Sequence, residues 1–120
     1  MTTIALVDDE NSIRTSVSLA LESEGFKVDV FQNGIEALKA LESKNYDLGL
    51  FDIKMPKMDG NELLSKVRSS KNSSLKEMPI IFLTSKDQEQ DEIIGLRMGA
   101  ADYITKPFSQ KLLNERIRTV

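Results

Sequence analysis

The chain has 120 residues, of which 40% are hydrophobic and 29% are charged, and its formal net charge is -3. These values predict one globular domain that needs no disulfide or structural metal, and the negative charge argues against nucleic-acid binding by this segment itself. Because it contains neither Cys nor His, the chain cannot form a zinc site of the usual nitrogen and sulfur type, a Cys nucleophile or a Ser-His-Asp triad.

The side chains that remain for chemistry are carboxylates, hydroxyls, lysine and arginine. This set favours hard cations such as Mg2+ and anionic ligands such as phosphate. The first apolar run, residues 4–7, ends in three acidic residues, so the pattern shows neither the core of a signal peptide nor a membrane span. We therefore expect a cytoplasmic protein that does not associate with membranes.

Five short apolar runs predict strands, and in chain order they cover residues 4–7, 27–31, 48–51, 80–83 and 102–104. Between and after them, apolar residues recur at helical spacing within residues 13–21, 35–41, 63–67, 93–98 and 112–117. The polar segment from Ser69 to Glu77 shows no periodicity, and we expect a solvated loop there. The order of elements is therefore a strand followed by a helix, repeated five times.

Strands that alternate with helices require parallel, right-handed crossovers, and the fully apolar first, third and fourth strands indicate a sheet covered on both faces. The sequence therefore predicts an α/β fold with a doubly wound, five-stranded parallel sheet. In such a sheet, ligands bind at the carboxyl ends of the strands, at the point where the strand order reverses. Chemistry is expected at that edge.

Unusual polar residues follow four of the predicted strands: Asp8 and Asp9, Asp52, Thr84 and Lys106. Taken one at a time, each has an ordinary structural explanation as a helix cap or a turn residue. Their joint occurrence at strand ends instead predicts a cluster of carboxylates, a hydroxyl and an ammonium. Two carboxylates about 4 Å apart repel by roughly 4 kcal/mol at an effective dielectric of about 20, so a proton or a cation must intervene.

Four motifs at these positions resemble the signatures of response regulator receiver domains, and the resemblance covers essentially the whole chain. They are residues 7–10, 51–60, 83–85 and 103–108. The resemblance implies a single receiver domain over residues 1–120 with the flavodoxin-like fold of CheY. Residues 81–113 are similar to the OmpR/PhoB subfamily, and the sequence around Asp52 is similar to that of ChvI-type regulators.

The family's phosphoacceptor matches Asp52, which would receive a phosphoryl group from a phosphohistidine on a sensor histidine kinase. The resemblance also implies a Mg2+ site. Asp9 and Asp52 would bind the ion directly, Asp8 would bind it largely through water, and the main-chain carbonyl of Lys54 would complete the protein ligands. The metal would neutralise the charges that meet in phosphoryl transfer.

Three further residues match the family's catalytic and switch positions. Lys106 would pair with a phosphoryl oxygen, Thr84 would donate a hydrogen bond to the phosphoryl group, and Tyr103 would turn into the space that Thr84 leaves. The peptide bond after Lys106 would be cis, as in the family. Lys54 and Lys86 match positions that tune the loss of the phosphoryl group, although exposed lysines need no such explanation.

The OmpR/PhoB resemblance implies a homodimer that forms on phosphorylation, through an apolar patch ringed by intermolecular ion pairs. The patch matches Ile93, Leu96 and Leu113, and one ion pair matches Asp102 with Arg116. We therefore expect a symmetric dimer through the fourth predicted helix, the fifth strand and the last helix.

Other positions depart from the subfamily's pattern of charges. Glu92 stands where the pattern has a basic residue, Leu112 stands where it has an acid, and Ala101 replaces the first of two acids. The expected dimer therefore depends mainly on apolar burial. Members of the subfamily continue into a winged-helix DNA-binding domain. Of the two alternatives, a receiver followed by such a domain and a receiver that stands alone, we expect the first, with DNA contact made only through the second domain.

Three other functions fit the sequence less well. Aspartyl-phosphate hydrolases of the haloacid dehalogenase type carry a second acid two residues after the nucleophile, where this chain has Lys54. Nucleotide-binding or flavodoxin-like modules favour a glycine-rich or hydroxyl-rich phosphate loop after the first strand, where this chain has Asp8, Asp9 and Glu10. A pure interaction module would have no use for the full set of acceptor residues.

Overall fold

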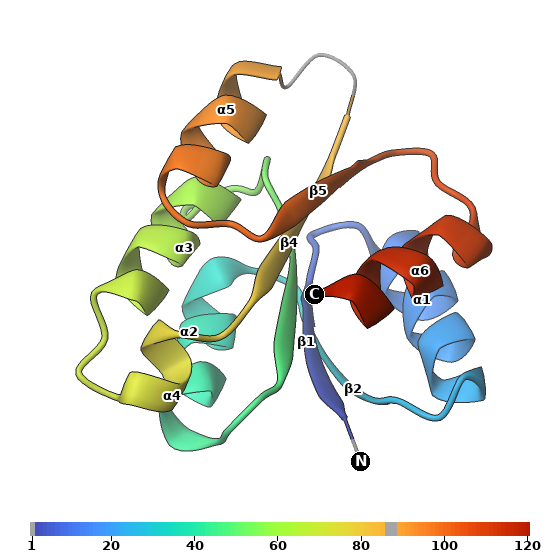
Figure 1. Ribbon diagram of the computed structural model, residues 1–120, viewed down its shortest axis with the longest axis horizontal. Helices are drawn as coiled ribbons and strands as arrows, with labels where there is room; N and C mark the ends of the chain where they lie inside the picture. The colour runs from blue at the N-terminus through green and yellow to red at the C-terminus, as the bar shows by residue number, and fades with distance from the viewer. Residues whose placement is uncertain (1, 86–88) are drawn as a thin grey trace.

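The structure is a computed structural model that describes residues 2–85 and 89–120, with the backbone alone described at 89–92. One sheet of five parallel strands, in the order β2-β1-β3-β4-β5, forms the centre of the molecule (Figure 1). The strands are β1 (Thr3–Val7), β2 (Lys27–Phe31), β3 (Leu48–Asp52), β4 (Ile80–Thr84) and β5 (Asp102–Thr105). The strand order reverses between β1 and β3, which places the expected binding edge between these two strands.

Helices cover both faces of the sheet, which confirms the predicted doubly wound fold (Figure 1). One face carries α1 (Asn11–Ser23) and α6 (Gln110–Thr119). The other face carries α2 (Gly34–Ser43), α3 (Gly60–Arg68) and α5 (Glu89–Arg97), with the short α4 (Ser73–Lys76) beside α3. Within the described residues, none of these helices is long and apolar enough to cross a membrane.

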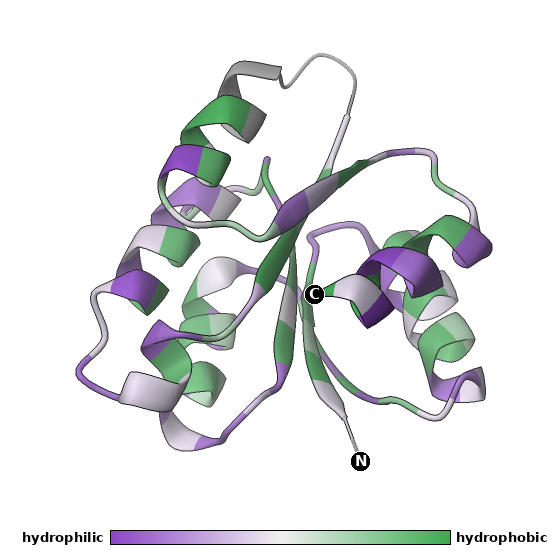
Figure 2. Cartoon of the chain, viewed as in Figure 1, coloured by the Kyte–Doolittle hydropathy of each residue, from purple (hydrophilic) through white to green (hydrophobic). Residues whose placement is uncertain are grey.

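The core consists of two apolar layers, because successive strand residues point to opposite faces of the sheet. Ile4 and Leu6 of β1 pack toward α1 and α6, whereas Ala5 and Val7 pack toward α2 and α3. The central strands β3 and β4 are buried along their whole length. Figure 2 shows them in the colours of hydrophobic residues, with polar residues concentrated on the outer faces of the helices.

The third and fourth strands each extend one residue beyond their predicted ends. Asp52 pairs with Leu83 and Thr84 pairs with Thr105 in the parallel registers, so both polar residues lie within strands rather than after them. This difference matters for the site, because a side chain on a hydrogen-bonded strand is held more rigidly than one on a loop.

The segment from Ser69 to Glu77, which the sequence predicts to be a loop, contains the single helical turn α4. Asn72 caps that turn, since its Oδ1 accepts hydrogen bonds from the N–H groups of Ser74 (3.0 Å) and Leu75 (3.4 Å). Leu75 is buried and ties the turn to the core. One turn is too short to produce a helical period, so periodicity could not have revealed it.

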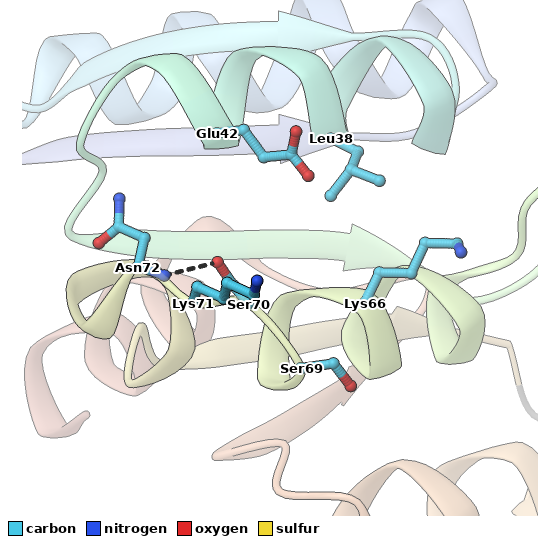
Figure 3. A pocket seen from close by; sticks show the side chains of 7 residues that line it. All are labelled: Leu38, Glu42, Lys66, Ser69, Ser70, Lys71 and Asn72. Atoms are coloured by element: carbon cyan, nitrogen blue, oxygen red, sulfur yellow. Dashed lines mark hydrogen bonds between the residues drawn. The ribbon is translucent and has the colours of Figure 1, made fainter.

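A groove of about 500 Å³ runs between α2 and α3 (Figure 3). Leu38 and Glu42 line it from α2, Lys66 lines it from α3, and residues 69–72 close one end. Its lining is polar apart from Leu38, and it contains none of the polar residues from the strand ends. The groove is therefore separate from the predicted site.

Arg68, the last residue of α3, joins three segments through one guanidinium. Its Nη1 donates to the carbonyls of Lys76 (2.9 Å) and Met78 (2.8 Å), and its Nη2 donates to the carbonyl of Gly99 (2.7 Å). These bonds fasten the entry to β4 and the connection between α5 and β5 onto α3. Partial burial lowers the pKa of Arg68, which is the cost of removing this charge from water.

We predict that Arg68→Met lowers the free energy of unfolding by about 1–3 kcal/mol, because the variant leaves three carbonyls without their charged donor. Urea denaturation followed by circular dichroism measures this. Arg97→Met, at an exposed position on α5, is the matched control and should change stability by less than about 0.5 kcal/mol. Equal losses in the two variants would show that the three hydrogen bonds contribute nothing.

Candidate functional site

The carboxyl edge of the sheet brings the predicted residues together. Asp8 and Asp9 follow β1, Asp52 ends β3, Thr84 ends β4 and Lys106 follows β5. Each of the three acids offers a carboxylate oxygen, and these oxygens all lie within 4.8 Å of one another. Residues separated by up to 98 positions along the chain therefore meet at one place.

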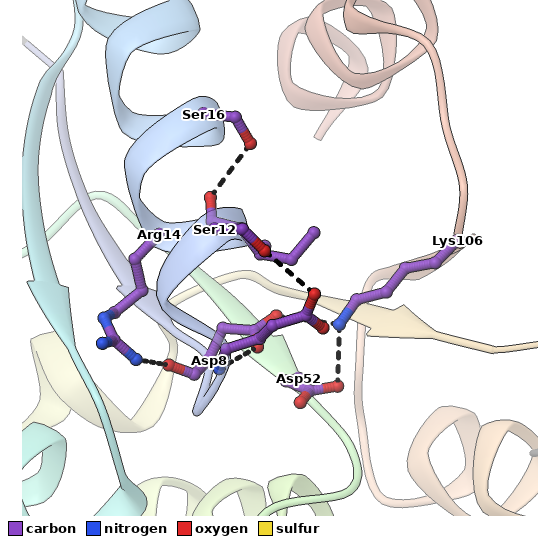
Figure 4. Close-up of polar contacts among 8 residues, drawn as sticks. Asp8, Ser12, Arg14, Ser16, Asp52 and Lys106 are labelled. Carbon is purple, nitrogen blue, oxygen red and sulfur yellow. Dashed lines mark hydrogen bonds and ion pairs between the residues drawn. The ribbon is translucent and has the colours of Figure 1, made fainter.

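Lys106 is the cation that joins the acidic residues (Figure 4). Its Nζ lies 2.9 Å from Oδ2 of Asp8 and 3.3 Å from Oδ1 of Asp52. The peptide bond after Lys106 is cis, which confirms the expectation drawn from the resemblance. Asp8 is fully buried, Asp52 is 6% exposed, and Asp9 is exposed, so the cluster opens to solvent on the side of Asp9.

Burial and the neighbouring charges shift the pKa values of Asp52 and Lys106. Burial, and then the negative charge of Asp8, raise the pKa of Asp52 to about 7, and Lys106 offsets only part of this rise. Burial lowers the pKa of Lys106, but its ion pairs with Asp8 and Asp52 outweigh burial and raise that pKa above its ordinary value. At neutral pH the ammonium is charged, whereas the Asp52 carboxylate is poised between its two forms. A bound cation would favour the ionised form.

The turn after β3 packs tightly against the backbone of Asp52, and Gly60 makes this possible. A Cβ at Gly60 would lie 2.6 Å from the carbonyl oxygen of Asp52, closer than atoms of this kind approach. The N–H of Gly60 donates to the carbonyl of Ile53 at 2.7 Å, and Asp59 caps α3 by accepting from the N–H of Glu62. The start of α3 is thereby held directly behind the acidic residue.

The remaining predicted site residues lie near the same edge. Thr84 is buried, and its hydroxyl donates to the carbonyl of Ser85 at 3.2 Å. Tyr103 lies on β5 and is partly buried against the core layer beneath α2 and α3. The side chain of Lys54 is exposed. Lys86 lies outside the described residues.

Sequence reasoning missed Arg14, whose Nη1 donates to the main-chain carbonyl of Asp8 at 2.7 Å (Figure 4). The available signal was an arginine in the first turns of the helix that follows the acidic residues, a place where a positive charge opposes the helix dipole.

Comparisons with known proteins agree with this geometry. The family model described as response regulator receiver domain matches residues 4–118. The chain belongs to this family. It is 42% identical over 117 residues to the alkaline phosphatase synthesis transcriptional regulatory protein PhoP of Bacillus subtilis, and 38% identical over 120 residues to the transcriptional regulatory protein PcoR of Escherichia coli.

These alignments cover 98% and 100% of the receiver domain but 47% and 51% of the two relatives, so the chain spans about half their length. Among solved structures, the chemotaxis protein CheY4 of Vibrio cholerae superposes with a TM-score of 0.92 at 32% identity, covering 100% of this chain and 98% of that one. The CheY-like fold is therefore confirmed, and the chain is a receiver domain of a two-component response regulator.

The structure corrects one apolar residue of the predicted dimer face. Ile93 and Leu96 are exposed, at 39% and 43%, but Leu113 is fully buried among the residues beneath α1 and α6. Leu113 and Ile117 form the inward stripe of α6, which leaves Leu112, 42% exposed, as the apolar residue on its outer side.

The ion pair predicted between two copies already exists within one chain. Arg116 Nη1 lies 2.7 Å from Oδ2 of Asp102, joining α6 to the start of β5. An intermolecular pair would have to replace this contact. The side chain of Glu92 lies outside the described residues, and Ala101 is exposed.

We predict that, in EDTA, Asp52→Asn makes the receiver domain more stable than wild type at pH 8, by roughly 1–3 kcal/mol, with the difference vanishing near pH 4. The pKa of Asp52 is raised on folding, from 3.8 to about 7, so the folded state holds its proton more tightly and stability falls as pH rises through this window. Urea unfolding at a series of pH values measures the difference. A difference independent of pH would contradict the raised pKa.

Proposed function

We propose that this receiver domain accepts a phosphoryl group on Asp52 from the phosphohistidine of a sensor histidine kinase. The observation that carries the proposal is the position of the Asp52 carboxylate. It ends a buried strand, it is paired with Lys106 at 3.3 Å, and it shares a cluster with Asp8 and Asp9. These positions support the proposal because they offer a candidate nucleophile, a cationic partner and candidate metal ligands.

The acidic residues fit a Mg2+ ion, because oxygen atoms are its preferred ligands and because a cation would counteract the burial and the charge of Asp8 that raise the pKa of Asp52. We propose that Asp9 and Asp52 bind Mg2+ directly, that Asp8 acts largely through water, and that the carbonyl of Lys54 is the remaining protein ligand. When bound, the ion neutralises negative charge on the acceptor and on the phosphoryl oxygens.

The chain's own residues then perform the transfer. An oxygen of ionised Asp52 attacks phosphorus in line, the bond from phosphorus to the histidine nitrogen breaks, and the electron pair leaves with that nitrogen. Lys106 moves from the Asp52 carboxylate to a phosphoryl oxygen. The hydroxyl of Thr84 gives up its hydrogen bond to the Ser85 carbonyl and donates to another phosphoryl oxygen. Water later hydrolyses the acyl phosphate, with Lys54 and Lys86 as candidates for tuning that rate.

Movement of Thr84 toward the phosphoryl group is the proposed switch. It would vacate space at the end of β4, beside β5, into which Tyr103 can turn. Tyr103 lines a depression of about 230 Å³ together with Leu112 and Arg116 of α6, so its rotation would alter the outer face of β5 and α6.

The whole protein is proposed to be a cytoplasmic transcription regulator of the OmpR/PhoB type. The support is that the two relatives described above are named as transcriptional regulatory proteins and are about twice as long as this chain. A winged-helix DNA-binding domain after the receiver would supply the DNA contact. The narrower likeness to ChvI-type regulators stays a prediction.

We predict that acetyl phosphate adds one phosphoryl group to the wild-type domain only when Mg2+ is present, and that Asp52→Asn is not labelled. Intact-mass spectrometry with Mg2+ or with EDTA measures this. Asp47→Asn, an exposed acid just before the opposite end of β3, is the matched control and should be labelled like wild type. Equal labelling of the Asp52 variant, or labelling in EDTA, would refute the assignment.

A second prediction concerns the dimer, which would bury the exposed apolar residues Ile93, Leu96 and Leu112. Exposed ion pairs contribute only about 0–1 kcal/mol and are screened by salt, so dimerisation of the beryllofluoride-treated domain should depend weakly on ionic strength. Analytical ultracentrifugation should show Leu96→Glu raising the dimer Kd at least about tenfold. The control, Leu19→Glu at an exposed leucine on α1, should leave it unchanged.

Two results would exclude this dimer. One is a strict monomer at high micromolar concentration after beryllofluoride treatment. The other is a dimer that dissociates steeply as salt is added, which would show that ion pairs rather than apolar burial hold the two copies together.

A further inference from the structure

The loop between β1 and α1 begins with Asp8, and each polar atom of this residue has a partner. Its N–H donates to the carbonyl of Phe31 on β2 at 3.1 Å. Its carboxylate accepts from the N–H of Glu10 and from Lys106, both at 2.9 Å. Its carbonyl oxygen accepts from Nη1 of Arg14 at 2.7 Å. The peptide group that leads from Asp8 to the next residue is therefore fixed by a side chain.

Arg14 approaches the loop from the side opposite Lys106 (Figure 4). Its Nη2 also donates to Oδ1 of Asn11 at 3.3 Å, so the planar guanidinium spans an acceptor in the loop and one at the start of α1. The carbonyl of Asp8 and the N–H of Asp9 belong to one planar peptide. Holding that carbonyl therefore sets the direction in which the chain enters Asp9.

The helix itself does not explain an arginine at this position. Residue 14 lies near the amino end of α1, where a positive charge opposes the helix dipole. The first turn has no acidic residue to compensate, and the N-cap residue Glu10 makes no side-chain cap hydrogen bond. The hydrogen bond to the Asp8 carbonyl, the shorter of the two described for this side chain, offsets that unfavourable position.

We propose that Arg14 is a positioning residue for the metal ligands: by holding the Asp8 carbonyl, it orients the Asp8–Asp9 peptide and directs the exposed Asp9 carboxylate toward Asp52. This inference rests on the proposed Mg2+ site. Removing a group that orients metal ligands in this way commonly weakens metal binding about 10–100-fold.

Electrostatics alone predicts the opposite effect, which makes the test decisive. Arg14 carries a positive charge beside a cation site, so removing it without any structural consequence would strengthen Mg2+ binding. Positioning predicts weaker binding instead. The sign of the change therefore separates the two roles.

Isothermal titration calorimetry with Mg2+ alone, on the apo domain, is the primary measurement. Arg14→Met, which keeps an aliphatic stem, should raise the Mg2+ Kd about 10–100-fold. Arg14→Lys, a single point donor without the planar fork, should raise it about threefold or more. Arg118→Met, at an exposed arginine on α6, should bind like wild type. Labelling of Arg14→Met by acetyl phosphate should recover its wild-type rate at saturating Mg2+.

Unchanged or tighter Mg2+ binding by a folded Arg14→Met variant would overturn the inference. If circular dichroism shows that this variant does not fold, Arg14→Lys decides, and a wild-type Kd there would overturn it. Asp9→Asn separates the two proposals. If wild type binds Mg2+ no more tightly than Asp9→Asn, the proposed metal site itself is wrong, whereas Asp9-dependent binding that is unchanged in Arg14→Met refutes only the role of Arg14.

Discussion

The ammonium of Lys106, held between the carboxylates of Asp8 and Asp52, is the interaction on which the arrangement of this site depends. Two ionised carboxylates in a shared, buried place repel by several kcal/mol, roughly 4 kcal/mol at 4 Å and an effective dielectric of about 20. One lysine offsets part of that energy, but burial and the charge of Asp8 still raise the pKa of Asp52 above its ordinary value. The site is therefore built with a deficit of positive charge, which a divalent cation can supply.

Maintaining such a deficit requires a rigid frame, because mobile acids would simply move apart. Asp52 belongs to a strand paired on both sides, and the start of α3 closes behind it through a glycine that leaves no room for a side chain. Asp8 is fixed by both its backbone and its carboxylate. Stability lost at the acidic residues is offset by two apolar layers that cover both faces of the sheet.

Periodicity was sufficient for the fold, since the predicted strands lie within one residue of the observed ones, and the strand ends identified the acidic cluster. Periodicity was not sufficient where a segment is very short or where tertiary contacts decide which side chain is buried. The turn at α4 is too short to have a period, and Leu113 and Leu112 are equally apolar in sequence although only one faces the core. Arg14 was missed because its acceptor is a main-chain carbonyl, so the sequence shows only a positive charge near the start of a helix and not the partner of that charge.

The packing of α5 explains how a change at the acidic edge could reach the outer face. Gly95 sits directly on the ring of Phe82, and any Cβ there would overlap it, so the helix touches the sheet through its smallest residue. Phe82 lies two residues before Thr84 on the same strand, while Arg68 holds the segment just after the helix through the carbonyl of Gly99. A shift of β4 would therefore act on α5 directly at Gly95, where the backbone of the helix meets the Phe82 ring.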